Sequence, residues 1–161
     1  MIKFEINQKI GQKINRKKLD KIIKKANQIL RLKKDYSFSL AIVSDKEIKK
    51  LNKIYRKKDK STDVLSFSFA ESKSKDFKPK NKIIDLGEII ISFQTAQKQA
   101  REAGYLIENE ICRLLVHGLL HLFGYNHIKK GDSKIMEKLE SKILAESKLS
   151  EYPPIASNNN F

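Results

Sequence analysis

The stretch IENEICRLLVHGLLHLFGYNH, residues 107–127, carries the features that decide the fold. Its apolar residues recur at the spacing of one helix face, which predicts a buried helix from about Glu108 to Phe123 that ends at Gly124. The expected core positions on that face are Ile107, Ile111, Leu114, Leu115, Gly118, Leu119 and Leu122. His117 and His121 fall at the margin of this face, so the helix is expected to be central and to carry a polar site at its end.

All three histidines of the chain lie in this stretch, at positions 117, 121 and 127. Residues four apart share a helix face, so His117 and His121 can direct their imidazoles at one ion, and a turn after Gly124 can bring His127 to the same point. An isolated histidine on an apolar helix is more often a core residue, but a core has no need of this spacing. Three imidazoles with a fourth position open are typical of catalytic zinc, so the spacing predicts one Zn²⁺ per chain.

The same histidine spacing occurs in metzincin proteases, where a glutamate after the first histidine is the general base. Gly118 occupies that position here. A peptidase without this carboxylate lacks the group that deprotonates the attacking water, so Gly118 argues against proteolysis. Glu110 and Glu88 are weak candidates for the missing base or for partners of a histidine N–H, and a solvated or capping role for Glu110 is an equal alternative.

The rest of the chain alternates strand and helix patterns. Strand patterns cover about 2–6, 36–43, 63–70 and 82–91. Helical patterns cover about 16–32, 44–56, 92–104 and 132–147 in addition to the central helix. In the second helix, a Ser44 capping box precedes a predicted apolar stripe of Ile48, Leu51, Ile54 and Tyr55.

These elements predict an α+β fold, in which a mixed sheet of about four strands is flanked by about five helices and the metal site lies at the end of a central helix. A length of 161 residues suits one compact domain. We expect residues 1–148 to form a single hydrolase domain and residues 149–161 to form a polar C-terminal tail. The single cysteine, Cys112, and the lack of a long apolar run favour a soluble, cytoplasmic protein with no membrane partner.

The formal net charge of +15 favours a polyanionic partner, with nucleic acid the commonest. The alternative is a compositional bias of the coding sequence, because lysine, isoleucine and asparagine are abundant throughout. The charge alone therefore favours RNA or DNA without specifying either.

Three blocks of the sequence resemble one family. HGLLHLFGYNH, residues 117–127, is similar to the H-G-x-L-H-L-x-G-Y-D-H signature of the YbeY family of bacterial rRNA-maturation endoribonucleases. LNKIYRKKDKSTDVLSF (51–67) resembles its L-N-x-x-Y-R-x-x-D-x-x-T-D-V-L-S-F block, and LGEIIIS (86–92) resembles L-G-D-I-x-I-S. Asn126 and Glu88 stand where the family usually has aspartate; Asn126 loses the charge, whereas Glu88 keeps it.

This resemblance implies metal-dependent cleavage of single-stranded RNA in 16S rRNA maturation and ribosome quality control, with the small ribosomal subunit or its assembly factors as partners. It also implies that Arg56 is the catalytic or phosphate-binding arginine, acting with His117. A guanidinium can bind two phosphate oxygens, and Lys57, Lys58 and Lys60 follow Arg56 as candidate RNA-binding residues. Without the resemblance, a solvated cation at the helix end is an alternative for Arg56.

Several alternatives stay open at this point. The zinc ion would either lower the pKa of a bound water or polarise a phosphoryl oxygen, and the nucleophile is either water or the ribose 2′-OH. Residues 62–67 are either a sheet edge that pairs with an extended substrate or ordinary core. The rival functions are a zinc metalloprotease-like hydrolase and a non-catalytic RNA-binding ribosome assembly factor. The oligomeric state is not indicated.

Overall fold

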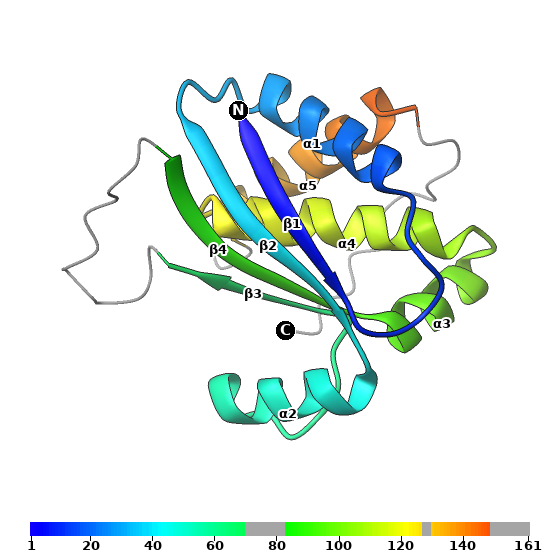
Figure 1. Ribbon diagram of the computed structural model, residues 1–161. Helices are drawn as coiled ribbons and strands as arrows, with labels where there is room; N and C mark the ends of the chain where they lie inside the picture. The colour runs from blue at the N-terminus through cyan, green and yellow to red at the C-terminus, as the bar shows by residue number, and fades with distance from the viewer. Residues whose placement is uncertain (70–82, 127–129, 149–161) are drawn as a thin grey trace.

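The computed structural model describes residues 1–69, 83–126 and 130–148. The strands in this part of the chain are β1 (Ile2–Gln8), β2 (Asp35–Val43), β3 (Val64–Ser68) and β4 (Ile83–Ser92). The helices are α1 (Arg16–Ile29), α2 (Asp45–Arg56), α3 (Phe93–Ala103), α4 (Ile107–Leu122) and α5 (Lys130–Glu146). The predicted α+β fold with a mixed four-stranded sheet and five helices is confirmed for these residues (Figure 1). The predicted tail, 149–161, lies outside them.

The sheet has the order β1-β2-β4-β3. β1 pairs with β2 and β2 with β4 in parallel, whereas β3 runs antiparallel to β4. β1 and β3 are therefore the two edge strands. The predicted sheet edge at residues 62–67 corresponds to β3, although Val64 and Leu65 within it are also buried core.

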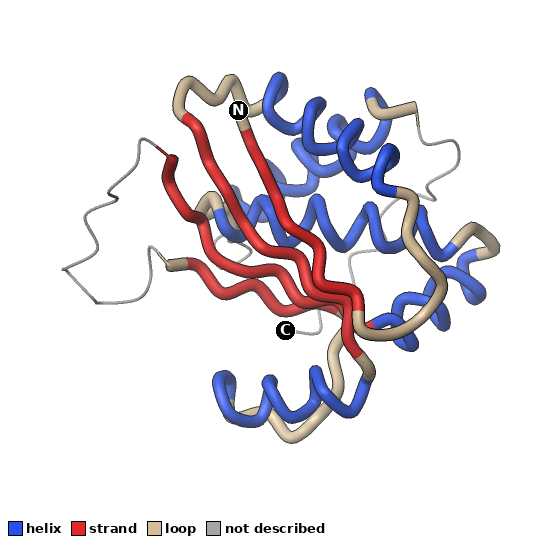
Figure 2. Tube along the Cα trace, viewed as in Figure 1, coloured by secondary structure: helices blue, strands red, loops and turns tan. Residues whose placement is uncertain are grey.

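Helices cover the two faces of the sheet unequally. α1, α4 and α5 pack together on one face, while α2 lies alone on the other (Figures 1 and 2). Because side chains alternate along a strand, Leu40 and Ile42 of β2 join the large core under α4, and Ala41 and Val43 join a smaller core under α2. None of the helices in the described part of the chain is long and apolar enough to cross a membrane.

The central helix α4 is buried on more sides than one apolar stripe predicts. The predicted core positions Ile111, Leu114, Leu115 and Leu119 are at most 1% exposed. Cys112, Val116 and Leu120, outside that stripe, are fully buried as well. The reason is that α4 lies between the sheet and the helices α1 and α5, so it has apolar neighbours on opposite sides.

The predicted start of α2 is correct, but its predicted apolar stripe is wrong at one end. Ser44 accepts a hydrogen bond from the backbone N–H of Glu47 at 3.2 Å, as an N-cap does. Ile48 is fully buried, whereas Ile54 is 49% exposed and Tyr55 is 64% exposed. The last turn of α2 reaches β3, where Tyr55 contacts Phe67, and β3 is the last strand of the sheet among the described residues.

Candidate functional site

His117 and His121 lie one turn apart on α4 and converge. Their Nε2 atoms are 3.1 Å apart, and their rings meet at an interplanar angle of 73°. Two imidazole lone pairs at this separation repel each other unless a proton or a metal ion lies between them. The predicted convergence of His117 and His121 is therefore confirmed, because the four-residue spacing brings the two possible metal ligands to one point.

The separation of these two nitrogens fits a tetrahedral zinc ion. Ligand nitrogens about 2.0–2.1 Å from such an ion lie about 3.3 Å apart. His127 lies outside the described residues, and the residues that the structure describes contain no group of three or more His, Cys, Asp or Glu side chains placed to hold a metal. The assignment of His127 as third ligand stays a prediction.

The chain turns back after α4 immediately before position 127. Gly124 has a φ of 90°, a left-handed conformation that glycine adopts without strain. The N–H of Gly124 donates to His121 O, and the N–H of Tyr125 donates to Leu120 O at 3.1 Å, which is the pattern of a Schellman motif. The predicted break at Gly124 is confirmed, so the chain leaves the helix axis close to the two histidines.

Glu140 of α5 forms a hydrogen bond with Nδ1, the second ring nitrogen of His117. Its Oε2 lies 3.2 Å from Nδ1 of His117, and the residue is 2% exposed. A carboxylate only accepts hydrogen bonds, so Nδ1 carries the proton and Nε2 of the neutral ring presents its lone pair. A buried carboxylate that orients a histidine in this way is common behind metal ligands.

Glu140 was not among the residues predicted for the site. A signal existed, because Glu140 lies four residues after Met136 and three before Ile143, on the buried face of α5. A glutamate on an apolar helical stripe is unusual and needs a partner. That partner is on α4, 23 residues away in sequence, and helical periodicity cannot identify it.

Glu110 is not solvated, and its partners in the described part of the chain are Arg113 and Tyr105. It is fully buried and binds Arg113, whose Nε lies 3.1 Å from its Oε1, and it also accepts a hydrogen bond from the hydroxyl of Tyr105. Seven residues separate Glu110 from His117, about 10 Å along the helix axis, whereas Arg113 is within one turn. The solvated or capping role considered for Glu110 is therefore wrong, and its link to His117 is indirect.

Arg113 connects the two buried carboxylates. Its Nη1 lies 3.9 Å from Oε1 of Glu140, so charged groups extend from Glu110 through Arg113 and Glu140 to His117. Burial alone would lower the pKa of Arg113, but the hydrogen bonds and charge of Glu110 raise it above its ordinary value. Burial and the hydrogen bond to Glu110 raise the pKa of Tyr105 to about 12. Arg113 and Tyr105 therefore stay protonated at neutral pH.

Arg56 lies at the free edge of β3, close to α4. Its Nη2 donates to Ser66 O at 3.2 Å, and the Ser66 hydroxyl donates to Gly118 O at 3.3 Å. Gly118 directly follows His117, so Ser66 joins the arginine to the histidine turn. Two hydrogen bonds through Ser66 therefore connect Arg56 to the turn of α4 that carries His117.

The predicted basic loop after Arg56 has a defined conformation. Lys57 adopts a left-handed φ of 59° at the C-cap of α2, and the buried Asn52 donates to Lys60 O at 2.8 Å. Lys57, Lys58 and Lys60 are exposed. A side-chain hydrogen bond from inside the helix thus shapes the loop that presents these cations beside Arg56.

Comparisons with known proteins identify the family of the chain. The family model for endoribonuclease YbeY matches residues 1–148. The chain belongs to the endoribonuclease YbeY family. It is 44% identical over 140 residues to the endoribonuclease YbeY of Aquifex aeolicus, covering 86% of this chain and 87% of that protein. It is 36% identical over 151 residues to the endoribonuclease YbeY of Ureaplasma parvum, covering 92% of each chain.

A solved structure supports the fold. TM1509 from Thermotoga maritima, determined in solution, matches with a TM-score of 0.58 at 27% identity, covering 91% of this chain and 89% of that one. The resemblance to the YbeY family that the three sequence blocks indicate is therefore confirmed.

Gly118 of the YbeY-like histidine motif faces the sheet. A Cβ at this position would lie 2.8 Å from Cγ2 of Ile89 and 3.0 Å from Oγ of Ser66. The helix can approach the sheet this closely only because residue 118 has no side chain. A glutamate at this position, as in metzincins, would collide with the sheet.

The structure does not bring Glu88 to the histidines. Glu88 pairs with Phe67 across the β3–β4 ladder, and Phe67 packs on the α2 face of the sheet. Ile89 and Ile91 point to the opposite face, under α4. Burial raises the pKa of Glu88, and nearby Lys9 opposes this shift. Because neighbouring residues of a strand point to opposite faces, Glu88 lies on the α2 face of the sheet, away from the face that α4 covers with His117 and His121.

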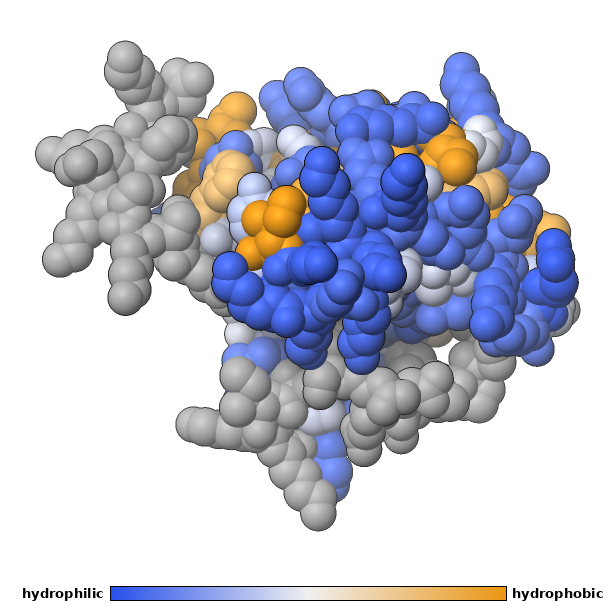
Figure 3. All heavy atoms as spheres, turned by 90° about the horizontal axis from the view of Figure 1, so that it is seen from below, coloured by the Kyte–Doolittle hydropathy of each residue, from blue (hydrophilic) through white to orange (hydrophobic). Residues whose placement is uncertain are grey.

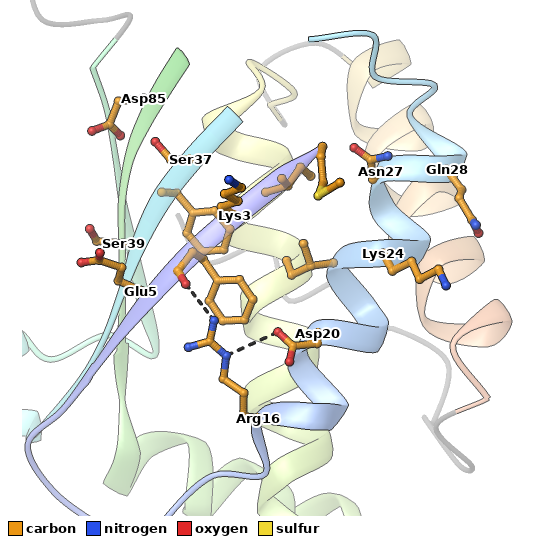
Figure 4. A pocket seen from close by; sticks show the side chains of 15 residues that line it. Lys3, Glu5, Arg16, Asp20, Lys24, Asn27, Gln28, Ser37, Ser39 and Asp85 are labelled. Carbon is orange, nitrogen blue, oxygen red and sulfur yellow. Dashed lines mark hydrogen bonds and ion pairs between the residues drawn. The ribbon is translucent and has the colours of Figure 1, made fainter. Parts of the chain in front are cut away.

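A separate hollow of about 960 Å³ lies between α1 and the other edge strand, β1 (Figure 4). Arg16 projects into it, donates to Phe4 O at 2.9 Å and pairs with Asp20. Neither His117 nor His121 lines it. The two edges of the sheet thus differ, since Arg56 and its contact with Ser66 belong to the β3 edge.

Proposed function

We propose that this chain is a metal-dependent endoribonuclease that cleaves single-stranded RNA during small-subunit rRNA maturation. The observation that carries the proposal is the convergence of His117 and His121, whose Nε2 atoms are 3.1 Å apart, on a helix that hydrogen bonds through Ser66 connect to Arg56. Membership of the endoribonuclease YbeY family supports the nuclease activity.

The metal would be one Zn²⁺ per chain, held by His117, His121 and His127. A bound zinc ion supplies a Lewis acid that polarises a phosphoryl oxygen or lowers the pKa of water. The described donors suit it, because both are imidazole nitrogens at a separation close to that of tetrahedral ligands.

Glu140 and Arg113 would prepare His117 for this role. Glu140 keeps the proton on Nδ1, so the lone pair of Nε2 always faces His121. Arg113 lies between Glu140 and Glu110 and compensates two carboxylates that are at most 2% exposed. An unpaired buried carboxylate would instead take up a proton and lose its hold on the histidine.

Arg56 would bind the phosphate that is cleaved. A guanidinium has five N–H donors, and the bond to Ser66 O uses one of them. The side chain is exposed, so the other donors are accessible to phosphate oxygens and can stabilise the charge that develops on them. Lys57, Lys58 and Lys60 would raise the local concentration of RNA.

RNA is favoured over peptide as the substrate of this site. Gly118 supplies no carboxylate at the position of the metzincin base, and the formal charge of +15 suits a polyanion. The small ribosomal subunit or its assembly factors, in the cytoplasm, would be the partners.

Three proteins and two substrates test this function. Zinc-loaded wild type, His121→Ala and Arg56→Ala are incubated with single-stranded RNA and with an unstructured peptide, and metal content and RNA affinity are measured in parallel. We expect wild type to cleave RNA only, His121→Ala to lose metal and cleavage but keep RNA affinity, and Arg56→Ala to keep metal but lose most cleavage.

Two results would contradict the proposal. Cleavage of the peptide would favour the protease alternative, and full RNA cleavage by His121→Ala would remove the metal from the mechanism. The end groups of the products identify the nucleophile, since a cyclic phosphate requires the ribose 2′-OH and a 5′- or 3′-monophosphate formed without it requires water.

A further inference from the structure

Two aromatic rings lie together at the free edge of β3. Tyr55, in the last turn of α2, and Phe67, in β3, have ring centroids 5.1 Å apart and an interplanar angle of 60°. Tyr55 is nevertheless 64% exposed, and its neighbour Ile54 is 49% exposed. The Tyr55 ring therefore contacts Phe67 while most of its surface stays accessible.

The aromatic pair is next to Arg56 in sequence and in space, on the α2 face of the sheet, whereas α4 with its histidines covers the opposite face. Tyr55 precedes Arg56, and Phe67 follows Ser66. Arg56 donates to Ser66 O at 3.2 Å, and Ser66 donates to the backbone of α4 at Gly118. A substrate whose phosphate is bound by Arg56 therefore passes close to the Tyr55 ring.

The surroundings of the pair are hydrophilic and basic. Lys50, Lys58 and Lys60 are exposed and form no ion pair with any residue that the structure describes. Figure 3 views the molecule from the side on which α2 lies in Figure 1, and hydrophilic residues dominate this surface with several small, separate hydrophobic patches among them. A protein partner bound through apolar contacts needs a much larger patch. Aromatic faces among cations are instead typical of sites for single-stranded nucleic acid.

We propose that Tyr55, supported by Phe67, stacks on an unpaired base of the RNA whose phosphate Arg56 binds, and thereby selects single-stranded over double-stranded RNA. The inference rests on the proposed function and adds the residue that recognises the base. A base in a duplex is stacked on both faces and offers none to a protein ring, whereas an unpaired base offers a whole face.

Binding measurements on the full-length chain test this directly. Affinity is measured by fluorescence anisotropy in the presence of a chelator, where we expect no cleavage, for three probes. These are single-stranded oligoadenylate, the same backbone with abasic riboses, and a blunt RNA duplex. The variants are Tyr55→Ala, Tyr55→Phe, which keeps the ring, and Ile54→Ala, which removes a similarly exposed apolar side chain from the same turn.

We expect Tyr55→Ala to weaken oligoadenylate binding by roughly 5- to 150-fold, the range for one stacked base, and to leave the abasic and duplex probes unchanged. Tyr55→Phe and Ile54→Ala should bind all three probes like wild type. Thermal unfolding checks that Tyr55→Ala is folded, as its exposure leads us to expect.

The stacking role is overturned if Tyr55→Ala binds oligoadenylate like wild type, or if it loses as much affinity for the abasic probe. Failure of the proposed function has a different signature. In that case zinc-loaded wild type does not cleave RNA, while the binding comparison of Tyr55→Ala with Tyr55→Phe still decides whether a base stacks there.

Discussion

The two ring nitrogens of His117 have different partners, and this difference determines which of them can bind a metal. Nδ1 faces Glu140 at 3.2 Å and Nε2 faces His121 at 3.1 Å. The four-residue spacing of the histidines made their convergence predictable, because it depends only on helix geometry. Glu140 was not predictable in the same way, since its contact depends on how α5 packs against α4.

Replacing Glu140 by glutamine tests its role as a positioning residue. Glutamine keeps the shape of the side chain but removes the negative charge that favours the Nδ1–H tautomer. We expect zinc affinity, measured by competition with a chromogenic chelator, to fall about 10- to 100-fold. Glu146→Gln, on the exposed side of the same helix, is the control and should bind zinc like wild type. Equal zinc affinities for Glu140→Gln and wild type would rule out this role.

The observed positions of Glu110 and Glu88 also differ from the predicted ones, and each difference has a local cause. Glu110 lies near the histidines when α4 is drawn as a helical wheel, but the wheel omits distance along the axis, and Arg113 is the nearer partner. Glu88 shares β4 with Ile89 and Ile91 but points to the other face, because side chains alternate along a strand.

At the scale of elements, the contact between α4 and the sheet depends on Gly118. Its absent Cβ leaves room for Ile89 and Ser66, and the fully buried Ile89 has no space to withdraw. We expect Gly118→Ala to lower the free energy of unfolding by about 1–3 kcal/mol in urea denaturation, despite the better helix propensity of alanine.

The matched control for this substitution is Gly131→Ala. Gly131 is in α5, and a Cβ there would meet nothing within 4 Å. Alanine should therefore raise the free energy of unfolding by up to about 1 kcal/mol. If both substitutions stabilise the protein, the proposed close packing of α4 on the sheet is incorrect.

The start of α2 is linked to the start of α3 through one carboxylate. Asp45 accepts hydrogen bonds from Ser92, from Thr95 at 2.6 Å and from Ser61 at 3.3 Å. Burial alone would raise the pKa of Asp45, but these hydrogen bonds outweigh it and hold the pKa below its ordinary value. Asp45 therefore stabilises the fold above its unfolded pKa of about 3.9, and this contribution is lost as the pH falls through the folded pKa.

Asp45→Asn should lower the free energy of unfolding at neutral pH by about 1–2 kcal/mol, allowing for partial exposure. The difference from wild type should shrink as the pH is lowered from 7 to 3, because wild type then loses the same charge. Urea denaturation of both proteins between pH 7 and 3 measures this difference in the free energy of unfolding. A difference that does not change with pH would show that the charge of Asp45 does not contribute.

The strands and helices were largely predictable from the sequence. The point along a helix at which its contact with the sheet ends was not. Periodicity located each strand and helix because it reports which side chains share a face. It also placed Tyr55 on the buried stripe of α2, seven residues after Ile48. The stripe continues along the helix, but the sheet ends at β3, and the position of that edge is a property of the tertiary structure.

At the scale of the whole molecule, strand order determines which residues share a site. The order β1-β2-β4-β3 puts Arg56, Ser66 and α4 at one edge and the hollow beside β1 at the other. Strand patterns alone do not specify that β4 inserts between β2 and β3. Here the family blocks added a prediction that composition and periodicity did not make, namely that Arg56 and the histidines belong to one site.

The net charge of +15 should act mainly through the cations at the β3 edge. Affinity for single-stranded RNA should fall steeply between low and physiological salt, and each lost phosphate contact should reduce the log–log slope by about 0.7. We expect Lys57→Gln/Lys58→Gln to lower the slope, whereas Lys24→Gln, beside the hollow at the other edge, should leave it unchanged. Equal slopes for both variants would show that RNA does not follow the β3 edge.

The dependence of RNA cleavage on bound zinc tests the central claim most directly. Protein stripped with a chelator and dialysed is titrated with Zn²⁺, and bound metal and cleavage of single-stranded RNA are measured on the same samples. We expect no cleavage by the stripped protein and an increase that reaches its plateau at one zinc per chain. Full cleavage by protein that contains no metal would contradict the account.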